Sequence, residues 1–208
     1  MDLQKILYFL PGVIIGLTVH EFCHAYSAYL LGDTTAKEQG RLTFNPLKHI
    51  DIIGFLFIIF AGFGWAKPVE FNPENLRNLR RDKAIIAAAG PVSNLILGII
   101  FCLFLKAILY SLDREAISFS VFTEHIFYIF LYAASVNFGL FIFNLLPVPP
   151  LDGSHIVFSG LNLSVDLETK IRKIGIPVLF LIIIIQNQLN ITILPVGIIV
   201  DALLKVFL

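Results

Sequence analysis

Residues Ile6–Leu31 read ILYFLPGVIIGLTVHEFCHAYSAYLL, and this stretch decides the class of the protein. Its first half, Ile6–Val19, carries no charge, and its length suits a helix that crosses a membrane. His20, Glu21 and His24 nevertheless follow in the pattern H-E-x-x-H, which joins two imidazoles to a carboxylate. Such groups are costly to bury in lipid, so their presence in this helix indicates a functional site.

The composition places the chain among integral membrane proteins. Of its 208 residues, 57% are hydrophobic and only 14% are charged, with a mean hydropathy of +0.85. A soluble domain has about a quarter charged residues. The apolar runs are continuous rather than alternating, which predicts an all-α helical bundle in a lipid bilayer and not a β-barrel. The formal net charge of zero gives no support for a nucleic-acid partner.

The apolar stretches predict one transmembrane domain over residues 1–208, a polytopic bundle of about four to six membrane helices. We expect core helices at about residues 6–31, 84–112 and 126–149, and C-terminal helices at about 174–208. The C-terminal region allows either one helix ending near Leu189 or two short helices, with Gln186–Asn190 as the turn and Pro195 opening the second.

A further apolar run, Ile52–Trp65, is short and contains Gly54, Gly62 and Gly64. It suits a re-entrant segment within an irregular region at about residues 40–75. The alternative is a short, tilted true span.

The distribution of basic residues predicts the orientation. If Ile52–Trp65 does not cross, the loop after the first helix and the loop before the C-terminal helices lie on one side. Together they hold Lys37, Arg41, Lys48, Lys67, Arg77, Arg80, Arg81, Lys83, Lys170, Arg172 and Lys173. The positive-inside rule then places these loops in the cytosol, in a multi-pass protein of the plasma membrane. His20 would lie ~21 Å along the first helix, in the cytosolic half of the bilayer.

His20 and His24 lie four residues apart, so on a helix they share one face and can bind one metal ion. Glu21 lies beside that face, where its carboxylate can accept a proton from a water at the metal. A catalytic zinc ion has three protein ligands and one open position, so a third ligand must come from elsewhere in the chain. H-E-x-x-H is a short pattern, but a chance occurrence in an uncharged membrane helix is much rarer than in a soluble one.

The segment Asn144–Gly153, NLLPVPPLDG, is the leading source of that ligand. Its three prolines end the preceding helix, and irregular backbone at membrane depth is tolerated where protein encloses it or it lines a wet cavity. Asp152 is favoured as an oxygen ligand, and His155 is a competing candidate. In the alternative interpretation the segment is an ordinary turn and Asp152 is the N-cap of the next helix.

Three motifs, taken in order, resemble the site-2 protease family of intramembrane zinc metalloproteases. H-E-F-C-H in a first apolar helix and N-L-L-P-V-P-P-L-D-G after a later one match the family pattern, and Gly90–Asn94 resembles its G-P-x-x-N element. Gly40–Pro46 and Gly64–Val69 resemble the compact prokaryotic branch, in which we expect no inserted PDZ domain. The resemblance covers about residues 6–160.

The resemblance implies an intramembrane endopeptidase that cuts within or near transmembrane segments of membrane proteins, in regulated intramembrane proteolysis. His20, His24 and Asp152 would hold one Zn²⁺ per chain, and Glu21 would be the general base. Asn94 would contact the substrate or an oxyanion, or would serve as a helix-packing amide. The substrate, the pathway and the oligomeric state stay open.

Asn137 and Asn144 lie seven residues apart, on one face of the expected helix at about 126–149. They could line a polar path for water, but hydrogen bonds across helices are the favoured interpretation.

The second interpretation of the chain is a non-catalytic membrane protein that binds a metal or membrane helices. Glu21 argues against it, because a metal-binding protein has no need of an acid beside its histidines. A transporter is disfavoured because the sequence shows no convincing internal repeat.

Overall fold

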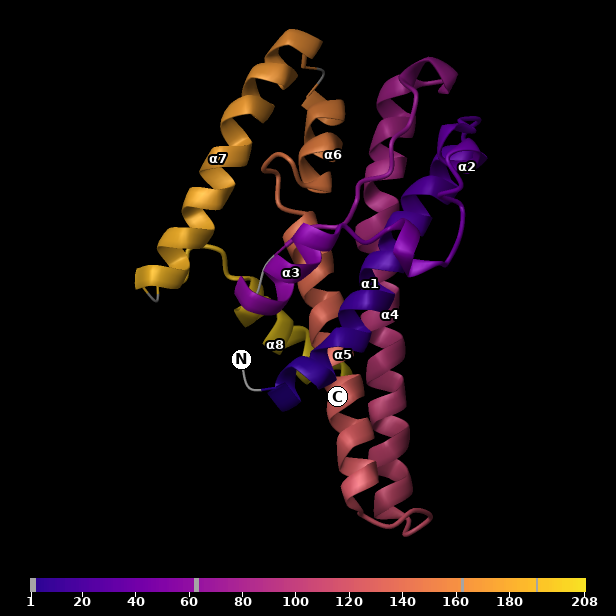
Figure 1. The fold of residues 1–208 in the computed structure, drawn as a ribbon, viewed down its shortest axis with the longest axis vertical. Helices are drawn as coiled ribbons and strands as arrows, with labels where there is room; N and C mark the ends of the chain where they lie inside the picture. Colours follow the sequence, from indigo (N-terminus) through magenta and orange to yellow (C-terminus); the bar gives the residue numbers. More distant parts are fainter. Residues whose placement is uncertain (1–2, 62–63, 162, 190) are drawn as a thin grey trace.

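The computed structural model describes residues 3–61, 64–161, 163–189 and 191–208, which form a helical bundle (Figure 1). Its helices are α1 (Leu3–Leu30), α2 (Thr35–Glu38), α3 (Ile52–Ala61), α4 (Leu79–Asp113), α5 (Val121–Asn144), α6 (Asp152–Leu161), α7 (Val165–Leu189) and α8 (Val196–Phe207), with the 3-10 turns η1 (Pro46–Lys48) and η2 (Pro73–Asn75). The strand pairing in these ranges is one isolated antiparallel bridge, between Ile50 and Ala66. The predicted all-α membrane fold is confirmed.

The centre of the molecule is a bundle of α1, α4 and α5, the three described helices that are long and apolar enough to cross a membrane. α4 and α5 run antiparallel and are joined at one end by residues 114–120 (Figure 1). α1 is the most enclosed, with 44% of its apolar window buried against 22% in α4 and in α5. Large apolar side chains on the outer face of α4, including Ile96, Leu103 and Phe104, are exposed, as expected where the surrounding solvent is lipid.

Glycines allow α1 to approach α5 closely. A Cβ atom on Gly12 would lie 2.6 Å from Cα of Ala133, and one on Gly16 would lie 2.9 Å from Oδ1 of Asn137. Small residues at helix crossings are common in membrane bundles, because close packing rather than hydrophobic burial holds the helices together. The close approach brings backbone carbonyls of α1 within reach of side chains on its neighbours.

α4 and α5 begin earlier than the apolar stretches predicted. Leu79 begins α4 after the N-cap Asn78, whose side chain accepts a 3.1 Å hydrogen bond from the backbone N–H of Arg81. Ser120 caps α5 in the same way and accepts from the backbone N–H of Thr123 at 3.2 Å. Hydropathy marks only the part of a helix that suits lipid, whereas the helix itself begins in a polar turn where a capping side chain satisfies the free N–H groups.

The ends of the later helices also differ from the prediction in part. α5 ends at Asn144 rather than near residue 149, because a proline-rich turn that starts at Pro147 cannot continue a helix. α7 begins at Val165, before the expected residue 174, and ends at Leu189; α8 follows Pro195. The region therefore holds two helices, with the second after Pro195 as one alternative expected, but Gln186–Leu189 belong to α7 rather than to a turn, and the end at Leu189 agrees with the other alternative.

The segment around α3 turns back on itself. Ile50 pairs with Ala66, and the backbone N–H of Lys67 donates to the carbonyl of His49 at 2.7 Å, so the two ends of the segment meet. α3 has 10 residues, or ~15 Å, which is too short for a hydrocarbon core about 30 Å thick. Ile58 of α3 packs against α1. A segment that is short and folds back is what the re-entrant interpretation expects, and its place relative to a membrane stays a prediction; residues 62–63 lie outside the described ranges.

Candidate functional site

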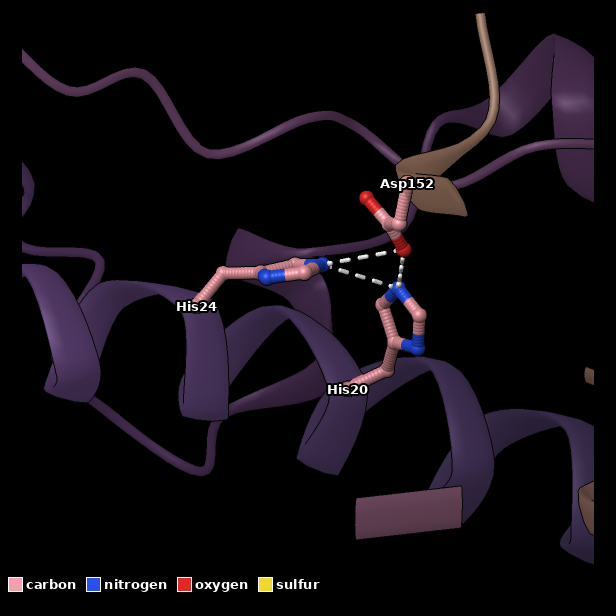
Figure 2. A group of neighbouring side chains, drawn as sticks. All are labelled: His20, His24 and Asp152. Atoms are coloured by element: carbon pink, nitrogen blue, oxygen red, sulfur yellow. Dashed lines mark hydrogen bonds and ion pairs between the residues drawn. The ribbon is translucent and has the colours of Figure 1, made fainter. Parts of the chain in front are cut away.

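Three side chains from two distant parts of the chain converge at one point (Figure 2). His20 and His24 lie on successive turns of α1, and Asp152 is the first residue of α6. Nε2 of His20 lies 3.1 Å and Nε2 of His24 lies 3.4 Å from Oδ2 of Asp152, and the two Nε2 atoms are 3.0 Å apart. In a tetrahedral zinc site with bonds of about 2.0–2.1 Å, ligand atoms are about 3.3 Å apart. The spacing of the three atoms therefore fits one zinc ion.

The outer nitrogens of both imidazoles are already bonded. Nδ1 of His24 lies 2.7 Å from the backbone carbonyl of Ile86, and Nδ1 of His20 lies 2.6 Å from Oδ1 of Asn94. A carbonyl oxygen only accepts, so Nδ1 carries the hydrogen in each ring and Nε2 of the neutral ring presents a lone pair. Two lone pairs and a carboxylate oxygen that point at one another repel unless a metal cation or a proton lies between them. The residues present fit a metal ion.

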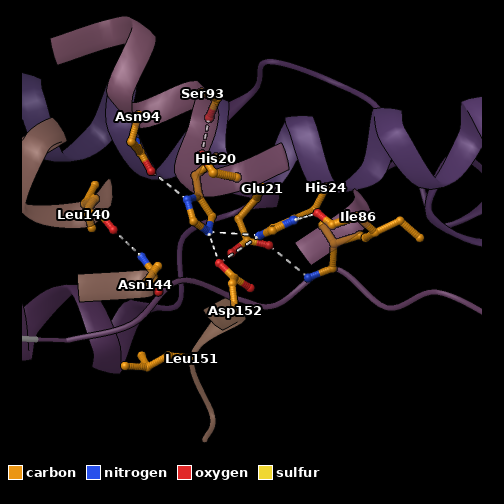
Figure 3. Close-up of polar contacts among 12 residues, drawn as sticks. His20, Glu21, His24, Ile86, Ser93, Asn94, Leu140, Asn144, Leu151 and Asp152 are labelled. Atoms are coloured by element: carbon orange, nitrogen blue, oxygen red, sulfur yellow. Dashed lines mark hydrogen bonds and ion pairs between the residues drawn. The ribbon is translucent and has the colours of Figure 1, made fainter. Parts of the chain in front are cut away.

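Asn94 joins this centre to a chain of buried amides (Figure 3). Its Nδ2 donates to the carbonyl of Gly16 at 3.1 Å and to Oδ1 of Asn137 at 3.0 Å, and the side chain is fully buried. Both N–H groups of the Asn94 amide are thus engaged, so this arrangement leaves none for a substrate or an oxyanion. We infer that Asn94 instead positions His20, because its oxygen fixes the ring from behind.

The other two asparagines differ from each other. Asn137 of α5 bonds across helices to Asn94, the arrangement that the sequence favoured. Nδ2 of Asn144 donates to the carbonyl of Leu140 in its own helix, at 3.0 Å (Figure 3). The described hydrogen bonds therefore place Asn137, and not Asn144, in the amide chain behind the centre.

Glu21 lies next to the converging atoms without joining them. Its side chain is buried, and Oε2 accepts a 2.9 Å hydrogen bond from the backbone N–H of Val69. Nη2 of Arg41 lies 4.0 Å from the same oxygen. The carboxylate therefore has a donor and a cation on one side, while the metal-binding group of His20, His24 and Asp152 lies close by (Figure 3).

Arg41 was not predicted as a site residue, and it links Glu21 to an extended segment. Its guanidinium donates from Nη2 to the carbonyl of Lys67 at 2.6 Å and from Nη1 to the carbonyl of Pro68 at 3.1 Å. The residue is only 5% exposed. Val69, whose N–H donates to Glu21, follows these two carbonyls directly in the chain. Arg41 therefore helps to position both the donor and the acceptor of the hydrogen bond between Val69 and Glu21. The sequence hinted at a role for Arg41 only because this residue lies in Gly40–Pro46, a stretch that resembles the compact prokaryotic branch of the family.

Gly90 was also missed, because its role depends on which face of α4 meets α1. A Cβ atom on Gly90 would lie 2.4 Å from Nε2 of His24 and 2.6 Å from Nε2 of His20. In the sequence, Gly90 stood out only as the first residue of Gly90–Asn94, a stretch that resembles a family motif; in the structure it lies inside α4. The missing side chain of Gly90 leaves the space in which the imidazoles and a metal ion fit.

His155, the competing candidate for the third ligand, lies outside the converging group. Both of its ring nitrogens face Arg172 of α7, with Nη2 2.9 Å from Nδ1 and Nη1 3.1 Å from Nε2. Burial and the nearby charges of Arg172 and Lys83 lower the pKa of His155 to about 4. The geometry thus favours Asp152 over His155; Asp152 is the first residue of α6, whereas the alternative interpretation had it as the N-cap that precedes the helix.

Comparisons with known proteins agree with this geometry. The family model described as "Peptidase family M50" matches residues 8–186. "Putative zinc metalloprotease YwhC" of Bacillus subtilis is 44% identical over 151 residues, which cover 72% of this chain and 67% of that protein. Rip2 of Mycolicibacterium smegmatis, with the same designation, is 29% identical over 74% of this chain and 57% of its own length. Rip2 of Mycobacterium tuberculosis is 26% identical over 69% of this chain and 53% of its own length. No solved structure matches.

We predict that Gly90→Ala loses bound zinc. The added methyl group would occupy space within 2.6 Å of both Nε2 atoms, so the imidazoles must move apart and the affinity for zinc should fall at least about tenfold. Metal content of the purified protein, measured by mass spectrometry, checks this. Gly160→Ala in α6 is the matched control, because a Cβ atom there meets nothing within 4 Å. Equal zinc in the two variants would contradict the placement of Gly90.

A second prediction concerns Asn94. Asn94→Ala removes the acceptor of the His20 Nδ1–H and should weaken zinc binding by about 10–100-fold, as loss of an outer partner usually does. Competition with a zinc chelator measures the affinity. Ser135→Ala serves as control, because that hydroxyl bonds only the Leu131 carbonyl of its own helix among the described contacts. Unchanged affinity in Asn94→Ala would show that the amide serves packing alone.

Proposed function

Because this chain belongs to peptidase family M50, the site-2 protease family of zinc metalloproteases, we propose that it hydrolyses peptide bonds within or near the transmembrane segments of membrane proteins. The observation that carries the proposal is that His20 and His24, in a helix apolar enough to cross a membrane, converge with Asp152 of α6 beside Glu21. Ionisable groups at such a depth are rare without a function.

In this proposal His20, His24 and Asp152 hold one Zn²⁺ ion per chain, with the fourth position open. When bound, zinc would polarise the scissile carbonyl and lower the pKa of a water molecule toward neutrality. The chain's own contribution is to keep both Nε2 atoms unprotonated and aimed at one point, through the hydrogen bonds that hold the two Nδ1 atoms.

Glu21 is the proposed general base. Its carboxylate lies beside the ligand group and is not one of the converging atoms, so it is free to take a proton from the attacking water. The same carboxyl group can then give that proton to the leaving amine. The Val69 N–H bonds only Oε2 among the described contacts of Glu21, which fixes the carboxylate while the other oxygen can meet the water.

Arg41 is the proposed positioning residue for Glu21. It does not reach the converging ligand atoms, but it holds the Lys67 and Pro68 carbonyls and lies 4.0 Å from the carboxylate. Through these contacts, Arg41 fixes the extended segment against Glu21.

We place the protein in the plasma membrane as a multi-pass protein with its active site in the cytosolic half. The support is that the charged beginnings of α4 and α7 lie at one end of the bundle, opposite the loop that joins α4 to α5 (Figure 1). The substrates would be transmembrane proteins, as regulated intramembrane proteolysis requires. A membrane helix hides its carbonyls in its own hydrogen bonds, so a substrate must unwind locally before water can attack.

The decisive test compares the wild type with Glu21→Gln, purified in bilayers and offered a panel of single-span substrates. Both proteins should hold about one zinc per chain. Only the wild type should cut inside the apolar span, and the variant should be slower by about 10²–10⁴-fold, the usual contribution of a general base. Mass spectrometry locates the cuts. Zinc bound in both without wild-type cleavage of any substrate would favour the non-catalytic alternative.

Arg41→Gln should lower kcat by about 10–100-fold while zinc content and KM change little, since Arg41 acts on Glu21 rather than on the metal ligands. Arg41→Lys should recover part of the loss, because lysine keeps the charge but not the two directed hydrogen bonds. The exposed Arg77, changed to Gln, is the control. If Arg41→Gln instead lost zinc and thermal stability, with kcat per bound zinc unchanged, its role would be structural only.

A further inference from the structure

A cavity lies at the charged end of the bundle, and His155 of α6 is one of its lining residues. Its volume is about 490 Å³, and its walls come from the start of α4, from α6, from the start of α7 and from the extended segment that follows Val69. Phe71 and Phe158 contribute apolar surface, so the cavity is lined by both apolar and charged groups. None of its lining residues belongs to the proposed zinc-binding group.

The charged lining residues leave an excess of positive charge. Arg80, Lys83 and Arg172 face a single carboxylate, Glu168, which gives a formal excess of two (three minus one). Nζ of Lys83 lies 2.7 Å and Nη2 of Arg172 lies 3.9 Å from Oε2 of Glu168. Arg80 is exposed, at the edge of the cavity. One acidic group therefore serves two cations, and the third adds to the positive field.

The contact between Arg172 and His155 shows the same excess of donors. Two guanidinium nitrogens lie 2.9 Å and 3.1 Å from the two ring nitrogens of His155. A neutral imidazole carries a hydrogen on one nitrogen, so only one of these contacts can be a hydrogen bond and the other sets two donors face to face. The lowered pKa of His155 has the same cause, because burial and the charges of Arg172 and Lys83 disfavour a further cation. An anion with several acceptor oxygens would satisfy these donors.

The cavity also lies next to a change from charged to apolar residues in two helices. In α4 the charged first turns end at Lys83, and the apolar part begins at Ala84. In α7 the charged turns end at Lys173, and the apolar part begins at Ile174. Both helices contribute lining residues from just outside this change, which is where a bilayer carries its phosphate groups.

From these observations we propose that this cavity binds the phosphate group of an anionic phospholipid, with Arg80, Lys83 and Arg172 around the phosphate and the aromatic walls against the glycerol and upper acyl chain. The cation cluster alone would fit any phosphate, and the level of the cavity together with its apolar walls favours the lipid as its source. This binding does not depend on the proposed catalytic function, and it can be tested without a substrate.

The test measures thermal unfolding of the full chain in neutral detergent, with phosphatidylglycerol or phosphatidylcholine added, and separately with inorganic phosphate. Phosphatidylglycerol should raise the Tm of the wild type more than phosphatidylcholine does, because ligand bound to the folded state stabilises it. Arg80→Gln and Arg172→Gln should each weaken the apparent binding of phosphatidylglycerol about fivefold, the equivalent of about 1 kcal/mol per basic residue.

Lys170→Gln is the matched control. It removes the same charge from the same helix as Arg172→Gln, but Lys170 is 69% exposed, pairs with Asp166 at 2.8 Å and does not line the cavity. It should keep the wild-type response. Because Arg80 is exposed, Arg80→Gln should fold normally even if Arg172→Gln does not.

Equal responses to the two lipids, or an equal loss in Lys170→Gln and in the cavity variants, would overturn the proposal. A wild-type response to inorganic phosphate as large as that to phosphatidylglycerol, lost in the same variants, would support the phosphate site and overturn the lipid as its source. Displacement of phosphatidylglycerol by an acidic peptide but not by phosphate would assign the cavity to a protein partner and overturn the proposal.

Discussion

Imidazoles and carboxylates inside a bundle surrounded by lipid must each find a partner, and this requirement governs the structure around His20 and His24. Each ring is bonded at Nδ1 by α4, through the Ile86 carbonyl or the Asn94 amide, and each directs Nε2 toward Asp152. α4 therefore contributes no side chain to the converging group, yet it fixes the direction in which both imidazoles point. A site built this way depends on the packing of α1 against α4 as much as on the ligands themselves.

The same requirement explains the glycines and the buried asparagines. The Asn94 amide reaches the carbonyl of Gly16 only because α1 approaches α4 and α5 closely, and a side chain on Gly16 would meet Asn137. Asn137 in turn donates to the carbonyl of Ala133 at 2.8 Å in its own helix. The amides thus form a continuous path of hydrogen bonds from α5 to the back of His20. Polar groups that are costly singly become tolerable when every donor has an acceptor.

Features of the fold and the site that depend on a short stretch of sequence could be predicted from the sequence alone. The four-residue spacing predicted the shared face of His20 and His24, and the prolines after Asn144 predicted an irregular turn from which Asp152 could reach that face. Helix starts were placed too late because hydropathy detects only the lipid-facing part, although Asn78 and Ser120 were recognisable as caps.

Two residues could not be placed from the sequence in the same way. The roles of Gly90 and Arg41 depend on contacts between segments that are distant in the chain, and no local spacing encodes them. The zinc-binding role of the three converging residues stays a prediction, and it is supported by atoms that would repel one another without a cation.

The extended segment beside Glu21, from Lys67 to Asn75, is held by hydrogen bonds at both ends and in its middle. These bonds help to fix the position of the Glu21 carboxylate, the proposed base. Beyond Arg41 and Glu21, the carboxylate of Asp33 accepts from the backbone N–H of Asn72 and from Nδ2 of Asn75, each at 2.8 Å. Burial alone would raise the pKa of Asp33, but the hydrogen bonds from Thr35, Asn75 and Asn72 outweigh it and hold the pKa below the usual value. Asp33 is therefore charged at neutral pH, and its contribution to stability is lost only as the pH falls through that lowered pKa. Glu21 lies in α1, and Asp33 lies just after the end of α1. The first helix and the turn that follows therefore supply the proposed base, Glu21, and also an anchor, Asp33, for the extended segment that orients Glu21.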